Sequence, residues 1–363
     1  MFNILKQVGE HFRLPGTLYS YDAITLGNIN STYKVTYSME ENRLKSYLFQ
    51  RVNTHVFKNP VEIMANIERV TSYLRAHYPE QMTLHFHHTE DGDNYYIEDS
   101  GYFWRVSNYI DSITFDVTED LAVIAAAGEA FGRFQMQLSN FDGSVLYETI
   151  PNFHNTKKRL DTLFASAEKD VCGRRTEVEA ELDYIRTVSD MAADLSIRYA
   201  NGELPTRVTH NDTKANNVLF DRVTKRPITV IDLDTVMPGM AMYDFGDAVR
   251  FIANTAVEDE SDLSKVYFDT AKFRAFAKGF IKEVKNAWTD AELHALVLAS
   301  FSITIEQTAR FLTDYLDGDT YFKTNYPTHN LVRTRCQMRL AQDIQRKWEE
   351  LESIVHDVLE QTV

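Results

Sequence analysis

Between residues 209 and 217 the chain reads Thr-His-Asn-Asp-Thr-Lys-Ala-Asn-Asn, a set of side chains that suits phosphoryl transfer. Asp212 could accept the proton of an attacking hydroxyl, and Asn217 follows close enough for one tight loop to aim both side chains into one cleft. Asp232 ends a later apolar run and offers, like Asn217, an oxygen ligand for Mg²⁺. We therefore predict Asp212 as the catalytic base and Asn217 with Asp232 as metal ligands. Lys214, two residues after Asp212, is predicted to stabilise the transferring group.

Two further residues are predicted to hold this segment in place. His210 is expected to brace the loop instead of taking part in the chemistry. The triplet Asp244-Phe245-Gly246 spells the motif whose Asp binds metal in protein kinases. Asp244 is too far along the chain from Asp212 for that role, and Pro238-Gly239 places a turn between them. We expect Asp244 to accept backbone N–H hydrogen bonds that tie down the catalytic loop.

The elements that position these residues can be predicted from local patterns. Aromatic and β-branched runs predict strands at 33–37 and 47–52, and a hairpin from 95–97 to 102–106. A helix is predicted to begin at Asn59-Pro60. Its apolar positions are Val61, Met64, Ile67 and Val70.

The rest of the chain has mainly helical patterns. They cover 119–138, 157–200, 262–316 and 330–360, and short strands are predicted within 206–234. A β-rich first third joined to a helical remainder with an embedded hairpin predicts an α+β, two-lobed kinase-like fold.

The predicted lobes divide the chain near residue 110. We place a nucleotide-binding lobe at 1–107, a hinge at 108–112, and a catalytic and substrate-binding lobe at 113–363.

Composition narrows the class of protein. The chain has 363 residues, of which 44% are hydrophobic, and a net charge of −15, so a large core is available and nucleic acid or an anionic membrane is a poor partner. No run approaches the roughly 18 apolar residues of a membrane span. Cys172 and Cys336 are far apart and are predicted to be reduced thiols. We expect a cytoplasmic protein without a nucleic-acid or membrane partner.

At the motif residues the chain resembles the aminoglycoside phosphotransferase and choline kinase superfamily. Its common pattern, H-G-D-x-x-x-x-N, then I-D-x-[DE], then G-x-x-x-x-D, occurs here as His210…Asn217, Ile231-Asp232-Leu233-Asp234 and Gly239…Asp244. The one departure in the first element is Asn211 in place of Gly. The resemblance implies the fold of that family, with ATP and Mg²⁺ as cofactors.

Segments over nearly the whole chain are similar to family members that phosphorylate N-acetylhexosamines. These segments are 27–33, 130–135, 208–217, 231–239, 258–266 and 326–335. The resemblance implies transfer to the anomeric hydroxyl of N-acetylglucosamine or N-acetylgalactosamine, which gives a sugar 1-phosphate. It further implies that Arg310 and Tyr321 hold the sugar beside Asp212.

The same resemblance assigns the nucleotide site. The residues implied are Asn28, Asn30, Ser31 and Thr32 over the phosphates, Gln50 and Glu68 near them, and Asn108 with Ile110 at the hinge. Such kinases usually carry a phosphate-binding Lys on the third strand, where this chain has Gln50 followed by Arg51. Neighbours in a strand point to opposite faces, so only one of the two can enter the cleft. Glu68 is the candidate partner of that residue.

Two other functions remain open from the sequence. One keeps the fold but changes the acceptor to an aminoglycoside, choline or a homoserine-like hydroxyl. The other is a nucleotide-binding pseudokinase that acts as a scaffold, which the missing strand Lys would suit. Against the pseudokinase, Asp212, Asn217 and Asp232 are all present.

Overall fold

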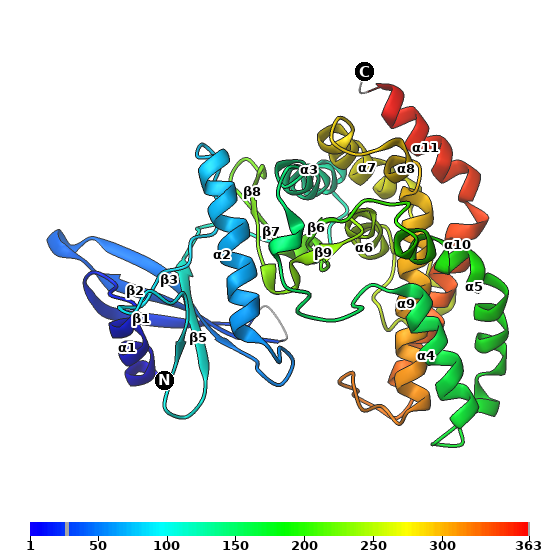
Figure 1. Cartoon of the computed structure of the whole chain (residues 1–363), viewed down its shortest axis with the longest axis horizontal. Coiled ribbons are helices and arrows are strands. Elements are labelled where there is room, and N and C mark those ends of the chain that lie inside the picture. The colour runs from blue at the N-terminus through cyan, green and yellow to red at the C-terminus, as the bar shows by residue number, and fades with distance from the viewer. Residues whose placement is uncertain (26–28, 362–363) are drawn as a thin grey trace.

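A five-stranded antiparallel sheet forms the core of the N-terminal lobe in the computed structural model, which describes residues 1–25 and 29–361 (Figure 1). The strands lie in the order β1-β2-β3-β5-β4. Their bounds are β1 Thr17–Ile24, β2 Ser31–Ser38, β3 Leu44–Val52, β4 Tyr96–Ile97 and β5 Phe103–Asn108. The predicted runs fall largely within these strands, because aromatic and β-branched side chains pack well on a pleated surface.

One helix covers each face of this sheet. Helix α1 (Phe2–His11) packs Leu5 and Val8 against one face, and the sequence analysis did not anticipate it. Helix α2 (Pro60–His77) lies on the other face, between the sheet and the C-terminal lobe (Figure 1). Its predicted apolar face is confirmed except at Val61, which is exposed, whereas Ile63 in the same first turn is buried.

The C-terminal lobe is mainly helical. Its helices are α3 Leu121–Gln137, α4 Thr156–Lys169, α5 Glu179–Ala200, α6 Met242–Ile252, α7 Thr270–Val284, α8 Asp290–Leu293, α9 Leu296–Leu316, α10 His329–Arg346 and α11 Trp348–Gln361. Helix α9 runs through the middle of the lobe and packs against α4, α5, α6 and α10 (Figure 1). The two lobes together confirm the predicted α+β, kinase-like fold. The boundary at 108–112 stays a prediction.

Helices α3 and α7 approach each other closely through glycine. A side-chain carbon on Gly279 would lie 2.0 Å from the backbone oxygen of Ala125, and one on Gly128 would lie 2.3 Å from that of Phe276. Only glycine leaves room for backbone contact at such positions. This contact fixes α3 behind the catalytic loop, where Phe131 and Phe134 pack on the ring of His210.

Two small antiparallel ribbons carry the catalytic segment between the lobes. Strands β7 (Val218–Phe220) and β8 (Pro227–Val230) form the predicted hairpin. Strand β6 (Arg207–Thr209) pairs with β9 (Met237–Gly239), a strand that the sequence analysis missed because it has three residues and contains a proline. The chain therefore enters the catalytic loop from β6, leaves it through β7, and returns through β8.

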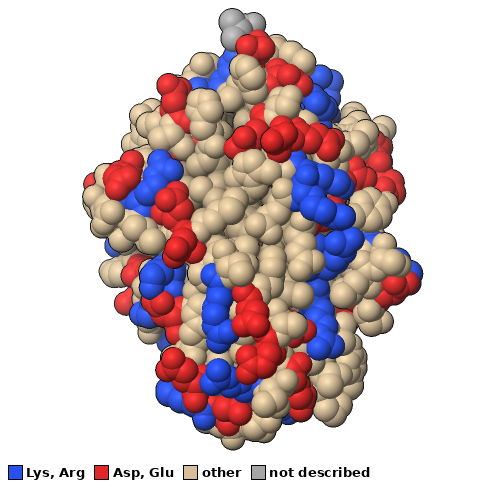
Figure 2. All heavy atoms as spheres, turned by 90° about the vertical axis from the view of Figure 1, so that its right-hand side faces the viewer, with Lys and Arg blue, Asp and Glu red and all other residues tan. Residues whose placement is uncertain are grey.

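The outer face of the helical lobe mixes charges of both signs. Figure 2, which views the molecule from the right-hand side of Figure 1, shows Lys and Arg interspersed with Asp and Glu around an uncharged centre. Among the helices between residues 2 and 361, none combines the length and hydropathy that crossing a bilayer requires.

Candidate active site

The backbone of the catalytic loop turns sharply after β6. Asn211 has a φ of 64°, a left-handed conformation that glycine adopts freely and that asparagine tolerates better than most residues. This explains why Asn can replace the Gly of the family pattern. The Asn211 side chain donates to the backbone oxygen of Thr235 at 2.8 Å, and the Thr235 hydroxyl donates to that of His210 at 2.7 Å. The loop is thereby bonded to the turn that follows Asp232.

Asp244 lies beneath this loop and is buried. Its carboxylate accepts the backbone N–H groups of His210 and Asn211, each at 2.8 Å, and the amide of Gln135 at 2.6 Å. Burial raises the pKa of Asp244, and these donors oppose that rise. The carboxylate thus has the geometry expected from the sequence, and its protein donors leave it no place in a metal site.

His210 is fully buried and bridges two parts of the loop. Its Nδ1 accepts the backbone N–H of Asp212 at 3.2 Å, so its Nε2 donates to the backbone oxygen of Ile231 at 2.9 Å. This neutral ring links the residue that precedes Asp232 to the predicted base. The position suits the bracing role expected of His210.

The four residues predicted to do chemistry come together in one cleft. Lys214 Nζ lies 3.0 Å from Asp212 Oδ1. Asn217 donates through Nδ2 to the backbone oxygen of Asp212 at 2.8 Å and to its Oδ2 at 3.1 Å, so its Oδ1 is the oxygen that could bind a metal. The backbone N–H of Ile231 bonds to the Asn217 carbonyl at 2.9 Å, so Asp232 follows directly beside Asn217.

Electrostatics in the cleft favour a cation. Loss of hydration, and then the charges of Asp234 and Asp212, raise the pKa of Asp232 to about 7. The Asp232 side chain keeps an accessible surface, as a metal ligand must. For Lys214, partial burial lowers the pKa, but Asp212 and then Asp247 outweigh it and the net shift is upward. Lys214 is therefore a cation beside the base.

On the side of the cleft predicted to bind the nucleotide, called here the nucleotide side, the sheet shows which of Gln50 and Arg51 faces the cleft. Gln50 lies on the face toward α2 and the cleft, where its Nε2 donates to Thr32 Oγ1 at 3.3 Å. Arg51 lies on the opposite face, with its guanidinium 4.4 Å from the ring centre of Tyr102. Gln50 therefore occupies the position of the usual lysine. Asn28 lies outside the described residues.

Asn30, just before β2, also approaches the cleft, whereas Ser31 does not. The Asn30 amide donates to Asp234 Oδ2 at 2.8 Å, and its oxygen accepts the backbone N–H of Asn53 at 3.0 Å. The Ser31 hydroxyl instead accepts from Arg51 at 3.4 Å, on the far face of the sheet. Thr32 and Asn30 are thus the described members of this predicted group that reach the cleft side.

The expected pairing of Glu68 with residue 50 or 51 is wrong. The Glu68 carboxylate accepts from Ser72 at 2.7 Å and from Arg75 at 3.3 Å, and it lies 3.4 Å from the Asn94 amide. These partners lie along α2 and the loop before β4, so local partners satisfy Glu68. The position on β3 that faces the cleft is Gln50, so no ammonium group stands there to draw Glu68 into the cleft.

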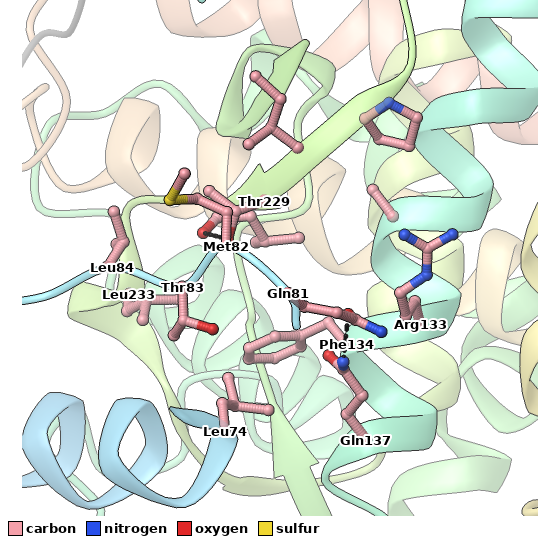
Figure 3. Close-up of a pocket in the computed structure, with 14 residues that line it drawn as sticks. Leu74, Gln81, Met82, Thr83, Leu84, Arg133, Phe134, Gln137, Thr229 and Leu233 are labelled. Carbon is pink, nitrogen blue, oxygen red and sulfur yellow. Dashed lines mark hydrogen bonds between the residues drawn. The ribbon is translucent and has the colours of Figure 1, made fainter. Parts of the chain in front are cut away.

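The predicted hinge residues line an open hollow of about 670 Å³ between the lobes. Asn108 and Ile110 border it together with Lys34, whose ammonium lies 4.6 Å from the ring centre of Tyr109. A hollow of this size can take a nucleotide base and ribose. A more enclosed pocket lies behind the hairpin, between α2, α3 and β8 (Figure 3). Its roughly 40 Å³ is too small for either substrate.

The side of the cleft predicted to bind the acceptor, called here the acceptor side, contains Arg310 and Tyr321. Arg310 lies there between two aromatic rings. Its guanidinium lies 5.6 Å from the ring centre of Phe153 and 5.6 Å from that of Phe322. Arg159 is close enough that the charge of Arg310, after burial, lowers its pKa. Tyr321 has 71% of its surface exposed, and its ring packs against that of Phe322.

The sequence analysis missed a buried pair that joins this side to the catalytic loop. His154 Nδ1 lies 2.9 Å from the carboxylate of Glu306, and its Nε2 lies 3.3 Å from the backbone oxygen of Asn211. Glu306 is 1% exposed and lies one turn before Arg310 on α9. A glutamate inside an otherwise apolar helical run was the signal available in the sequence.

The cation that Gln50 does not supply on the cleft face of the sheet comes from another strand. Arg105 of β5 donates through Nε to Gln50 Oε1 at 3.0 Å and forms an ion pair with Asp234. An arginine within the apolar run 103–106 marked it in the sequence, since charged residues are rarely buried without a partner.

Comparisons with known proteins agree with this fold. The sequence model described as "Phosphotransferase enzyme family" matches residues 20–278. The structure is similar to a microcompartment-associated aminopropanol kinase, at 14% identity and a TM-score of 0.59, over 96% of this chain and 98% of that one. It is similar to a Plasmodium vivax ethanolamine kinase (12%, 0.53, 88% and 82%) and to a spectinomycin phosphotransferase in complex with ADP and spectinomycin (12%, 0.53, 100% and 98%). At these identities the three structures share the fold.

Proposed function

The chain belongs to the phosphotransferase enzyme family, and from that premise we propose that it is an ATP-dependent sugar 1-kinase. Its acceptor would be the anomeric hydroxyl of an N-acetylhexosamine, either N-acetylglucosamine or N-acetylgalactosamine, and its product the sugar 1-phosphate. The proposal rests on the cleft geometry, on the character of the acceptor side, and on the sequence segments that resemble hexosamine kinases.

Asp212 would orient the attacking hydroxyl and take its proton. An anomeric hydroxyl is more acidic than an ordinary sugar alcohol, so modest assistance from a carboxylate suffices. Lys214, 3.0 Å from Asp212, would stabilise charge on the phosphoryl group as it moves between the two oxygens. His210 and Asp244 would take no part in the proton transfer. They would hold the loop in the conformation that aims Asp212 at the acceptor.

The residues present fit a magnesium ion bound together with the nucleotide. Mg²⁺ typically takes one or two protein carboxylates plus substrate phosphates, and Asp232 with the amide oxygen of Asn217 is such a donor set. When bound, the ion would neutralise negative charge that develops on the phosphate oxygens. The protein's part is to hold these two oxygens side by side, through the bond between Ile231 and the Asn217 carbonyl.

One observation carries the choice of acceptor. The acceptor side holds the guanidinium of Arg310 between Phe153 and Phe322, with Arg159 nearby. Two arginines repel a cationic amine but donate well to hydroxyl and carbonyl oxygens, and the rings offer apolar faces to a sugar. A neutral, oxygen-rich acceptor with an acetamido group fits this surface better than an amino alcohol does.

The test is a panel of acceptors with the purified protein, ATP and Mg²⁺. The panel would include both N-acetylhexosamines, glucose, choline, ethanolamine, homoserine and kanamycin, with ADP release measured in a coupled assay. We expect turnover with an N-acetylhexosamine and ³¹P–¹H coupling to the anomeric proton in the product. Preferential turnover of an amine would replace this proposal with the amino-alcohol alternative. ATP binding without turnover of any acceptor would favour the scaffold.

A further inference from the structure

Arg105 is a buried cation on the cleft face of the sheet. It lies opposite Gln50 in the register between β5 and β3, and Gln50 lies opposite Thr32 in the register between β3 and β2. The three side chains are joined in a row: Arg105 Nε donates to Gln50 Oε1 at 3.0 Å, and Gln50 Nε2 donates to Thr32 Oγ1 at 3.3 Å. The side chain of Arg105 is only 3% exposed.

The guanidinium of Arg105 reaches across to the C-terminal lobe. Its Nη1 forms an ion pair with Asp234, whose side chain is 2% exposed and whose second oxygen accepts the Asn30 amide at 2.8 Å. Asp234 lies two residues after Asp232, the predicted metal ligand. Arg105 therefore points at the part of the cleft where nucleotide phosphates would meet the metal.

The distance along β5 from the hinge hollow to Arg105 matches the length of a nucleotide. Asn108, at the hinge hollow, lies three residues after Arg105 on the same strand, which is about 10 Å at roughly 3.3 Å per residue. That is comparable to the span from an adenine ring to its outer phosphates. A buried arginine ion pair is a weak source of stability, because the cost of dehydrating both charges offsets their attraction. A guanidinium is well suited to bidentate contact with phosphate.

We propose that Arg105 is the phosphate-binding cation of this nucleotide site, supplied by β5 in place of a lysine on β3, and that Asp234 holds it until a nucleotide competes for it. The inference rests on the proposed function, because it presumes that the cleft takes ATP. In this arrangement Gln50 fixes one edge of the guanidinium through Nε, and the other edge exchanges the Asp234 carboxylate for phosphate oxygens. Asp234 then keeps the Asn30 amide as a partner.

The test compares Arg105 with a matched arginine on the other face of the sheet. Arg105→Met alone would strand the buried Asp234 carboxylate, so the change is made together with Asp234→Asn. The control is Arg51→Met, one strand away and facing Tyr102. Binding of MgADP and of adenosine is measured by calorimetry without any acceptor, and folding is checked by thermal unfolding of each variant.

We expect the double variant R105M/D234N to bind MgADP roughly 10- to 100-fold more weakly, the usual worth of hydrogen bonds to a charged group. Adenosine, which lacks phosphates, should bind with nearly unchanged affinity, and Arg51→Met should leave both affinities unchanged. Adding Gln50→Lys to the double variant should recover part of the MgADP affinity, because it returns a cation to the same face from β3.

Two outcomes would overturn the inference. One is a folded double variant that binds MgADP as tightly as the unaltered protein does, which would make the Arg105–Asp234 pair a structural link between the lobes. The other is an equal loss of MgADP and adenosine binding, which would mean that the sheet itself had shifted. An unaltered protein that bound neither ligand would instead contradict the proposed function.

Discussion

The two sides of the catalytic loop are built differently. On the nucleotide side, Arg105 and Asp234 are almost fully buried, and hydrogen bonds join them to neighbouring strands and across the lobes. On the acceptor side, Tyr321 is 71% exposed and Arg310 rests on aromatic rings. The nucleotide side is therefore organised before a substrate arrives, whereas the acceptor side combines the buried carboxylates of Glu306 and Asp314 with an accessible side chain, Tyr321. We therefore expect that acceptor specificity can change without disturbing the phosphate chemistry.

We expect the largest effect at Asp212, the predicted base, on which both sides depend. Asp212→Asn should lower kcat by roughly 10²- to 10⁴-fold, because an amide of the same size cannot take the hydroxyl proton. MgADP affinity and the KM of the sugar should change little. The measurement is steady-state kinetics on the preferred acceptor with calorimetry for MgADP. Asp161→Asn, at an exposed helical position on α4, is the control. Undiminished turnover would remove Asp212 from its assigned role.

Arg310→Met should weaken binding of the sugar without weakening binding of ATP. We expect the KM of the sugar to rise roughly 10- to 100-fold, because hydrogen bonds from a charged donor are lost, while the KM of ATP stays the same. Arg186→Met is a matched control, since Arg186 also lies over a phenylalanine ring but on the exposed surface of α5. Equal increases in both KM values would mean that the two sides are coupled.

Asp314→Asn should weaken binding of the sugar indirectly, through the turn that Asp314 holds. The buried Asp314 carboxylate accepts the backbone N–H groups of Thr320, Tyr321 and Phe322 at 2.8 to 2.9 Å, and so shapes the turn that presents Tyr321. An amide has one acceptor oxygen in place of two, so amide hydrogen exchange over 319–322 should speed up and the sugar KM should rise several-fold. The exposed Asp183→Asn is the control, and a KM change in both variants would contradict the assignment.

The sequence predicted the catalytic loop well because its geometry is local. Asp212 and Asn217 lie in one loop, and a seven-residue polar interval between two apolar runs announced the hairpin that returns Asp232. Helix α1 was missed although Leu5, Val8 and Phe12 repeat at helical spacing, so that omission was avoidable.

The sequence did not predict contacts between distant segments. Arg105 meets Asp234 across 129 positions, and His154 meets Glu306 across 152. No local pattern encodes such pairs, because each depends on how whole lobes pack. Glu68 was assigned the wrong partner for the opposite reason: a distant partner was expected, but its carboxylate bonds to Ser72 and Arg75, four and seven residues further along α2. The acceptor side consists mostly of such distant contacts, which is why its role rests on resemblance.

The smallest effect we expect is a response to acid confined to the nucleotide side. Burial lowers the pKa of His85 and of His87, whose Nε2 lies 2.9 Å from the Asn108 oxygen at the hinge. Because these rings have a pKa of 6.5 when unfolded, the unfolded chain binds more protons below that pH, and stability should fall as pH drops through 6.5. Hydrogen exchange should then rise near β5, while the turn at 319–322, whose backbone N–H groups bond to Asp314 and not to a histidine, should not respond. His87→Gln keeps a donor for Asn108 without a titrating ring and should reduce this pH dependence. An equal acid response in both regions would show that the two sides do not differ in this respect.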